Sequence, residues 1–329
     1  MNKSQQVLEV KNLKTHFFTR AGVVKAVNDI SFSVDKGEVL GLVGESGSGK
    51  SVMGFSILGL VDPPGRVVGG EIIFNGENIA QFSDKQMQQL RGKRIAMIFQ
   101  DPMMTLNPVL RIDTQMIEAI RTHENIDKRT AYERACEGLA LVGIPSPQER
   151  MSAYPHQFSG GMRQRVAIAI AMLNKPDLII ADEPTTALDV TIQAQILHQM
   201  QKICRESGMS LIWITHDLSV VAGLAKKISV MYSGRIVENG PIDDVLDRPC
   251  HPYTHGLIQS VPSRNRRGKK LYQISGTTPS LLNISPGCAF RSRCERQDQR
   301  CLTSPPGTSM MNGRQVYCWH PYEDEGAKV

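Results

Sequence analysis

The sequence predicts an α/β fold, and three observations carry the prediction. Short apolar runs with the length of buried strands alternate with segments of helical spacing over the second half of the chain. A glycine-rich stretch follows one apolar run, as it does where a strand leads into a phosphate-binding helix. The composition, 41% hydrophobic over 329 residues, supplies enough apolar side chains for large cores, and the length favours two domains or one large domain with an appendage.

The first third of the chain has the pattern of an antiparallel sheet beside a buried strand. Apolar residues alternate over 7–17 and again over 27–34, which predicts two antiparallel strands. The apolar run at 38–44 predicts a buried strand that leads into the glycine-rich loop, and helical spacing follows at 50–60. Residues 70–79 return to strand and turn character.

Helices and strands alternate through the middle of the chain. Apolar residues recur at intervals of three and four between 107 and 143, which predicts a helical insertion. Residues 159–176 predict a further helix, opened by Ser and Gly and closed by Asn-Lys-Pro. A strand at 177–182, a helix at 191–207, a strand at 210–216 and another helix follow, in the order that builds a parallel sheet.

The regular pattern ends with a hairpin and a short helix. Residues 227–240 predict a hairpin that turns on Ser-Gly, and a short helix is expected at 243–247. From His251 onward proline, glycine and basic residues increase and periodicity fades. The densest basic run, Arg264 to Lys270, predicts a solvated linker, with a contact to lipid or a partner as the alternative.

The sequence argues against a membrane-spanning chain. No apolar run approaches the roughly 18 to 20 residues that cross a bilayer, and the first ten residues lack the apolar centre of a signal peptide. We therefore expect the chain to stay in the cytoplasm, with other subunits supplying the spans if it works at a membrane. The net charge of +6 suits a phosphate ligand, an anionic membrane surface or nucleic acid and does not choose among them.

The stretch "GESGSGKS" fits the phosphate-loop pattern G-x-x-x-x-G-K-S/T in full, with a predicted buried strand before it and a helix after it. Its glycines let backbone N–H groups close around phosphates at the positive end of the helix. Lys50 is expected to neutralise the outer phosphates, and Ser51 to offer its hydroxyl to Mg²⁺. The predicted nucleotide-binding residues of this loop are Gly44, Glu45, Ser46, Gly47, Ser48, Gly49, Lys50 and Ser51.

Two adjacent carboxylates, Asp182 and Glu183, stand where the predicted strand at 177–182 ends. Asp182 is expected to hold Mg²⁺ through water, and Glu183 to polarise the water that attacks the γ-phosphate of a bound nucleotide. Two acids at a strand end can also merely cap the next helix. The presence of a phosphate loop favours the catalytic interpretation.

A second phosphate cradle occurs at "FSGGM", residues 158–162, where a Ser-Gly-Gly core exposes backbone N–H groups before a helix. With "GESGSGKS", "IFQDP", "LIIADEP", "ALD" and "WITHD", it stands in the order and approximate spacing found in ATP-binding cassette (ABC) ATPases. The chain resembles that family over roughly residues 7–240. The resemblance implies a P-loop NTPase fold with an antiparallel β subdomain and a helical signature subdomain.

The resemblance also implies roles for residues outside the loop. Gln100 would bind Mg²⁺ and couple its presence to a transport partner, and His216 would contact the γ-phosphate. Phe17 is the expected adenine-stacking aromatic residue, and Phe18 is its rival. Either phenylalanine could also be a core residue.

The second cradle is explained by pairing of two cassettes. In the resembling ATPases Ser159, Gly160 and Gly161 close over the ATP held by a second cassette that faces the first head to tail, and Asp189 lies along the same junction. The alternative is that "FSGGM" only caps its own helix. Met162 departs from the commonest family form, which has Gln, and we expect this departure to cost little because backbone groups and Ser159 do most of the phosphate binding.

The stretch "RPCHPYTHGLIQSVPS", residues 248–263, resembles an extension found in ATPases of di- and oligopeptide importers, a branch that includes nickel and glutathione importers. It implies a peripheral subunit on the cytoplasmic face of the inner membrane that hydrolyses ATP to power peptide uptake. The implied partners are a second, homologous cassette in a heterodimer, two transmembrane permeases and an extracytoplasmic substrate-binding protein.

We place the domain boundary near Arg248. An ABC ATPase domain is expected over 1–248, with its helical subdomain at about 107–172, and a small loop-rich extension over 249–329.

Importers of nickel or glutathione remain alternatives. A soluble ABC ATPase that acts on nucleic acid is a rival from another class; such proteins usually join two cassettes in one chain or add coiled coils or zinc modules. None of these is visible, so no nucleic-acid partner is expected.

Four of the seven cysteines crowd the end of the chain with the spacing C-x5-C-x6-C-x16-C: Cys288, Cys294, Cys301 and Cys318. In a cytoplasmic protein clustered cysteines point to metal rather than to disulfides, and four thiolates can close a zinc site or hold a 4Fe–4S cluster. The spacing does not separate the two metals. The resembling importer ATPases carry an iron–sulfur cluster here, which implies a 4Fe–4S site, with Zn²⁺ or free thiols as alternatives.

The expected role of the cysteine site is structural, because a small loop-rich segment buries little apolar surface of its own. Redox sensing is the alternative. His320 is a lesser ligand candidate and more simply a surface residue. The scattered Cys136, Cys204 and Cys250 are expected to be ordinary packing or surface residues.

Overall fold

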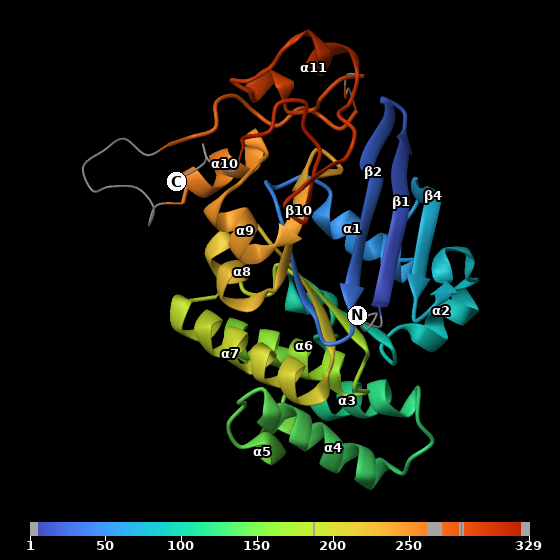
Figure 1. The fold of residues 1–329 in the computed structure, drawn as a ribbon. Coiled ribbons are helices and arrows are strands. Elements are labelled where there is room, and N and C mark those ends of the chain that lie inside the picture. The colour runs from blue at the N-terminus through green and yellow to red at the C-terminus, as the bar shows by residue number, and fades with distance from the viewer. Residues whose placement is uncertain (1–5, 187, 262–271, 283, 285, 324–329) are drawn as a thin grey trace. The chain divides into compact units, whose positions relative to one another are not determined.

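The computed structural model describes residues 6–186, 188–261, 272–282, 284 and 286–323 (Figure 1). The chain divides into two compact units, which we call unit 1 (1–7, 35–38 and 81–213) and unit 2 (8–34, 39–80 and 214–329). The predicted basic linker at Arg264 to Lys270 lies outside the described residues.

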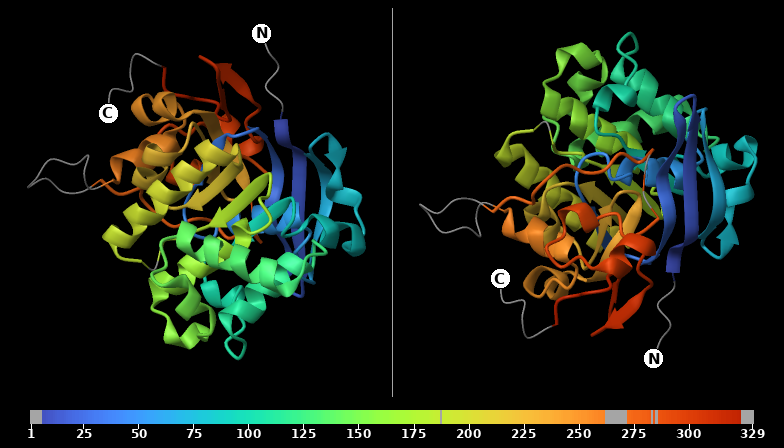
Figure 2. Two further views of the ribbon diagram at one scale, coloured as in Figure 1. Left: turned by 90° about the horizontal axis from the view of Figure 1, so that it is seen from below. Right: turned by 90° about the horizontal axis from the view of Figure 1, so that it is seen from above.

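Unit 2 contains a four-stranded sheet built from the predicted N-terminal strands. Strands β1 and β4 are antiparallel, with Leu8 opposite Phe74, and their inward side chains, such as Leu8 and Val10, are buried. Figures 1 and 2 show β2, β1 and β4, blue to cyan, side by side in every view. The sheet order is β2 (Gly22–Asp35), β1 (Gln6–Thr19), β4 (Gly65–Phe74) and β5 (Glu77–Asn78).

A second set of strands in unit 2 ends at β3, the predicted buried strand, whose five residues are all buried. Strand β3 pairs in parallel with β9, and β9 and β10 form the predicted hairpin. Strands β11 and β12, which the sequence pattern did not predict, extend this hairpin at β10. The order is β11 (Ser309–Met311), β12 (Arg314–Val316), β10 (Arg235–Pro241), β9 (Lys227–Tyr232) and β3 (Val39–Val43).

One helix of unit 2 was not predicted, because periodicity fades in that part of the sequence. Helix α10 begins at Pro252, whose fixed φ suits a first helical position, and His251 Nδ1 accepts the backbone N–H of Tyr253 at 3.0 Å. The helical elements are α1 (Lys50–Leu58), η1 (Ile79–Gln81), α8 (Leu218–Leu224), α9 (Ile242–Asp247), α10 (Pro252–Gln259), η5 (Arg291–Arg293) and α11 (Gln299–Thr303).

Unit 1 holds the parallel strands β8 (Ser210–Thr215), β7 (Leu178–Asp182) and β6 (Ile95–Ile98), in that order; β8 passes into unit 2 after Trp213. β6 and β7 are parallel, with Ile95 opposite Leu178. All residues of the three strands are buried, which fits a parallel arrangement covered on both faces.

The predicted helical insertion forms α3 and α4 in unit 1, drawn in green in Figure 1. Arg134 of α4 donates through Nε to the carbonyl of Leu173 at 3.0 Å, just after α6. Among the described residues no helix is long and apolar enough to cross a membrane. The helical elements are α2 (Asp84–Leu90), η2 (Pro102–Met104), α3 (Ile112–Arg121), α4 (Lys128–Leu141), α5 (Pro147–Met151), η3 (Pro155–Gln157), α6 (Gly160–Met172) and α7 (Val190–Ser207).

Candidate nucleotide-binding site

The glycine-rich loop joins β3 to α1 in unit 2, as the sequence predicts, and two of its glycines are required by close contacts. A Cβ atom on Gly44 would lie 2.2 Å from the carbonyl oxygen of Met231, and one on Gly49 would lie 2.1 Å from that of Ala26. Gly49 also has a φ of +100°, which L side chains rarely adopt. The loop therefore packs directly against the backbone of neighbouring strands.

Lys50 opens α1 and turns its side chain back into the loop. Its Nζ atom donates to the carbonyl oxygens of Gly44 at 2.8 Å and Glu45 at 3.0 Å, and the residue is 5% exposed. Ser51 follows in the first turn, half-buried. Ser48 is buried, and its hydroxyl has no hydrogen-bond partner among the described residues. A buried cation, an unused hydroxyl and a helix N-terminus together form a suitable environment for anionic oxygens.

The acidic pair lies at the end of β7 in unit 1. Asp182 is buried, and Glu183 follows with a φ of +44°, an unfavourable conformation for a residue with a side chain. Glu183 Oε2 accepts from Thr186 Oγ1 at 3.0 Å and from Gln100 Nε2 at 3.5 Å. The structure thus brings Gln100 and Glu183 together, although 83 positions separate them.

Neither acid caps the next helix, which was the alternative interpretation. The N-cap of α7 is Asp189, whose Oδ1 accepts the backbone N–H of Ile192 at 2.9 Å. Asp182 and Glu183 are thus not needed for capping, although they share the segment that leads into α7.

The second cradle forms the start of α6 in unit 1. Ser159 is the N-cap, and its hydroxyl accepts the backbone N–H of Met162 at 3.3 Å. The capping role is therefore real, yet Ser159 and Gly160 are both exposed. A Cβ atom on Gly160 would meet nothing within 4 Å, whereas one on Gly161 would lie 3.2 Å from Ile192. Within unit 1, the start of this helix is therefore exposed and accessible to a ligand or to a partner protein.

The remaining predicted nucleotide contacts belong to unit 2. His216 is exposed at the end of β8. Phe17 is half-buried and packs on Gly65, where a Cβ atom would come within 2.5 Å of its ring. Phe18 is 40% exposed and lies under the guanidinium of Arg66, 4.3 Å from the ring centroid. The two phenylalanines thus have different surroundings.

The four cysteines near the end of the chain are free thiols and all belong to unit 2. The backbone N–H of Cys288 donates to the carbonyl of Cys301 at 2.8 Å. Burial, with a smaller contribution from Cys288, Cys294 and Cys301, raises the pKa of Cys318 to about 12. The backbone of Cys288 thus contacts that of Cys301, but no three of the four sulfur atoms, all of them in the described part of the chain, lie within 4.8 Å of one another.

Two other side chains stand beside Cys301. Asp298, Cys301 and His320 each offer a potential ligand atom, and these atoms lie within 4.8 Å of one another. Asp298 Oδ2 is 2.9 Å from His320 Nε2. The sequence pattern indicated His320 but missed Asp298. As predicted, Cys136, Cys204 and Cys250 are ordinary packing residues, because all three are buried.

Comparison with protein families supports the resemblance seen in the motifs. Residues 27–186 match the ABC transporter family, and residues 237–301 match the C-terminal region of oligopeptide/dipeptide transporters. The dipeptide transport ATP-binding protein DppD of Bacillus subtilis (strain 168) is 48% identical over 96% of this chain and 95% of its own length. The chain belongs to the ATP-binding proteins of ABC peptide transporters. The oligopeptide transport ATP-binding protein OppD of Escherichia coli (strain K12) is 46% identical over 98% of this chain and 95% of its own.

Solved structures agree on the fold of this ABC transporter ATP-binding protein. The dimeric ATP-binding cassette MJ0796 bound to ADP and Pi superposes with a TM-score of 0.66 at 26% identity, over 71% of this chain and 98% of that one. A second dimeric structure of the same bacterial ABC transporter cassette has a TM-score of 0.65 over the same shares. The predicted α/β ABC ATPase fold is thereby confirmed.

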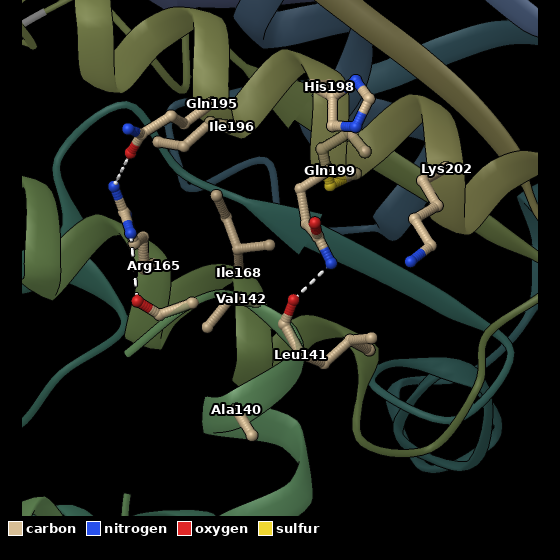
Figure 3. Close-up of a pocket in the computed structure, with 12 residues that line it drawn as sticks. Ala140, Leu141, Val142, Arg165, Ile168, Gln195, Ile196, His198, Gln199 and Lys202 are labelled. Carbon is tan, nitrogen blue, oxygen red and sulfur yellow. Dashed lines mark hydrogen bonds between the residues drawn. The ribbon is translucent and has the colours of Figure 1, made fainter. Parts of the chain in front are cut away.

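This ABC transporter ATP-binding protein also has a pocket of about 460 Å³ in unit 1, which none of the predicted site residues lines. Figure 3 shows Arg165 of α6 beside Gln195 of α7, to which it donates at 2.6 Å. Arg165 also donates to the carbonyl of Gly143 at 3.1 Å. Gln199 of α7 donates to the carbonyl of Leu141 in the same view. These bonds join α4, α6 and α7.

Proposed function

We propose that this protein is the ATP-hydrolysing subunit of an importer that takes up di- or oligopeptides. The observation that carries the proposal is the buried Lys50, held inside a glycine loop that ends at a helix N-terminus, in a chain whose C-terminal part matches peptide transporters. The names of its relatives, dipeptide and oligopeptide transport ATP-binding proteins, favour peptides over nickel or glutathione.

The proposed nucleotide site assigns each residue one task. The loop N–H groups and Lys50 bind the phosphates, because both supply positive charge at the start of α1. Ser51, Asp182 and Gln100 would hold Mg²⁺, an ion that prefers such oxygen ligands and neutralises charge on the phosphates. Within unit 2, the buried Ser48 hydroxyl, which has no hydrogen-bond partner among the described residues, is suited to a phosphate ligand.

Hydrolysis would depend on Glu183 as the general base. Its carboxylate orients the attacking water and takes its proton, while His216 donates a hydrogen bond to the γ-phosphate. The hydrogen bond from Gln100 to Glu183 would link the general base to Gln100, the residue that we expect to communicate with the transport partner. Phe17 would stack on adenine, with Phe18 as the rival.

The exposed start of α6 supports pairing with a second cassette. Ser159, Gly160 and Gly161 would complete the site of a homologous partner subunit, with Asp189 beside them, and the partner would complete the site of this chain. The cassette MJ0796, to which this chain is similar, is dimeric in both of its solved structures named above. Loss of the γ-phosphate removes charge that both halves bind, so hydrolysis would separate the subunits. We propose a heterodimer.

A permease would dock on the segment after Gln100. This segment exposes large apolar side chains, Met104 at 66% and Val109 at 75%, which is unusual on a surface that water covers. Two transmembrane permeases and an extracytoplasmic substrate-binding protein would complete the importer. The chain would then work as a peripheral protein on the cytoplasmic face of the inner membrane.

We further propose that 1–248 form the ATPase domain, with its helical part at about 107–172, and that the extension at 249–329 carries a metal centre. The four-cysteine cluster supplies free thiols, which are soft ligands of the kind that a 4Fe–4S cluster or, as the alternative, Zn²⁺ takes. When bound, the group would cross-link the extension. Protein purified without air should contain iron and absorb visible light, whereas a colourless, zinc-rich sample would favour the alternative.

The decisive experiment is transport by the reconstituted complex. The chain, its partner cassette and two permeases are placed in proteoliposomes with ATP on the cytoplasmic side, and uptake of a labelled dipeptide, a labelled oligopeptide, nickel and glutathione is measured with the binding protein outside. We expect ATP-dependent uptake of peptide alone, abolished by Lys50→Ala. Uptake of nickel or glutathione without peptide would contradict the proposed substrate.

A further inference from the structure

Glu45, the second residue of the phosphate loop, is held by the C-terminal extension. Arg293 donates to both of its carboxylate oxygens, from Nη2 to Oε1 at 3.0 Å and from Nη1 to Oε2 at 2.8 Å. Thr278 donates its hydroxyl to Oε2, and the backbone N–H of Glu45 donates to the Tyr253 hydroxyl at 2.9 Å. Three residues of the extension therefore bind a single residue of the loop, and all of them belong to unit 2.

The Arg293 side chain is itself fixed. It is 6% exposed, against 26% for Glu45, and its Nε atom donates to the carbonyl of Ser275 at 2.9 Å. Partial burial opposes ionisation of Glu45, but hydrogen bonds from Arg293 and Thr278 outweigh it and place the pKa of Glu45 below its usual value. A bidentate, largely buried salt bridge is stronger and better oriented than an ion pair on the surface.

Aromatic rings support this contact. The ring centroid of Tyr232, the last residue of β9, lies 4.6 Å from that of Tyr253 and 5.3 Å from that of Phe290. The guanidinium of Arg293 lies 5.8 Å from the centroid of Tyr232 and 6.0 Å from that of Phe290. Tyr232 and Tyr253 are fully buried, so the residues that bind Glu45 pack against a well-ordered aromatic cluster.

The Glu45 backbone is in turn hydrogen-bonded to the residues that would bind phosphate. Its carbonyl oxygen accepts from Lys50 Nζ at 3.0 Å and from the backbone N–H of Ser48 at 3.2 Å. A shift of the Glu45 backbone would therefore move the acceptor of the loop's lysine and the first hydrogen-bonded turn of the loop. The side chain of Arg293 controls that backbone through the carboxylate.

We propose that Arg293 is a positioning residue for ATP binding, which acts through Glu45 to hold the phosphate loop, and with it Lys50, in the arrangement that receives the nucleotide. The inference rests on the proposed nucleotide site at residues 44–51. It assigns the C-terminal extension a part in ATP affinity, carried by the residue before Cys294 and separate from the choice of transported substrate.

The test is a double-mutant cycle in the full-length chain, with the dissociation constant of a fluorescent ATP analogue as the readout. Arg293→Ala and Glu45→Ala should each weaken binding about tenfold, and the double variant should bind no more weakly than the weaker single variant. Arg296→Ala is the matched control, because this nearby exposed arginine stacks on Tyr322, 4.5 Å from the ring centroid, and should leave the constant within about twofold.

A purely structural role for Arg293 predicts a different pattern. If its loss only loosened the extension, the losses of ATP affinity in the two single variants would multiply in the double variant, and the midpoint of thermal unfolding of Arg293→Ala would fall. In the reconstituted transporter Arg293→Ala should raise the KM for ATP and leave kcat near the wild-type value. Arg293→Lys, which keeps the charge but loses the fork of donors, should lie between wild type and Arg293→Ala.

Two outcomes separate this inference from the proposed function. If Lys50→Ala binds the analogue as well as wild type, the nucleotide site itself is wrong, and the inference falls with it. If Lys50→Ala loses binding while Arg293→Ala stays within about twofold of wild type, or the single losses multiply, only the positioning role is overturned.

Discussion

Arg314 and Glu238 form an ion pair in which both side chains are completely buried, with Nη1 of Arg314 3.8 Å from Oε1 of Glu238. The two oxygens of Glu238 also accept the backbone N–H groups of Cys250 and His251, each at 2.9 Å. Arg314 Nη1 donates to the carbonyl of Asp244 at 2.9 Å. The pair thus joins β12, near the end of the extension, to β10 and to the start of α10.

Removing one partner of this pair should destabilise the protein strongly, because it leaves the other charge buried. Arg314→Met is expected to lower the free energy of unfolding by about 3 to 5 kcal/mol, measured by urea denaturation. The double variant with Glu238→Met should recover much of the loss, since no charge remains uncompensated. Arg129→Met is the control at an 88% exposed arginine. A loss for Arg314→Met no larger than that of the control would contradict the assignment.

His251 predicts a specific dependence of stability on pH. Complete burial lowers the pKa of His251 from 6.5 to about 3. Below pH 6.5 the unfolded chain therefore binds a proton that the folded chain does not, so the group's contribution is fully present above pH 6.5 and is lost as pH falls. The expected slope is about 1.4 kcal/mol per pH unit.

Replacing His251 should remove this slope. Asn can still accept the backbone N–H of Tyr253, so His251→Asn keeps a cap for α10. We expect the free energy of unfolding of this variant to fall less steeply than that of wild type between pH 6.5 and 5, by about 1.4 kcal/mol per unit. His198→Asn, at an exposed position of α7, controls for the loss of a histidine. Parallel curves for wild type and His251→Asn would refute the prediction.

A substitution at Gly160 should impair subunit pairing without impairing folding. Because a Cβ atom there meets nothing within 4 Å, Gly160→Leu should leave the midpoint of thermal unfolding nearly unchanged. It should nevertheless block ATP-driven pairing with the partner cassette and lower ATP hydrolysis about 30-fold or more, as expected for a central interface position. Light scattering with ATP measures the pairing. Gly223→Leu, also in open space on α8, should pair normally.

Phe17 and Phe18 can be told apart by their effect on ATP. If Phe17 stacks on adenine, Phe17→Ala should weaken binding of the fluorescent ATP analogue about tenfold, in the range of other base-stacking residues. Phe18→Ala should change it much less, because that ring already lies under Arg66. The reverse order of effects would transfer the adenine contact to Phe18.

Glu183 should be needed for hydrolysis but not for binding. In the reconstituted transporter Glu183→Gln should lower kcat by about 10² to 10⁴ while ATP still binds, because the amide cannot take a proton from water. Glu206→Gln, an exposed position on α7, should retain wild-type turnover. Brisk hydrolysis by Glu183→Gln would mean that another group serves as the base.

Local patterns explain which elements were predictable. The buried run of β3, the alternation in β1 and the Ser-Gly turn between β9 and β10 each depend on residues a few positions apart, so the sequence indicates them directly. Helix α10 was missed because its eight residues are too few for a clear period. Strands β11 and β12 are three residues each and form only where β10 offers an edge.

The sequence by itself determined the phosphate loop, the acids after β7, the second cradle at Ser159 and the family, because each is a short run whose spacing carries its chemistry. Only the tertiary structure decided three contacts between distant residues. Arg293 donates hydrogen bonds to Glu45, 248 positions earlier in the chain, and Arg314 is buried against Glu238. The ligand atoms of Asp298, Cys301 and His320 lie close together. Such contacts produce no periodic pattern in the sequence, because the two side chains meet only after packing has excluded water and has brought distant parts of the backbone together.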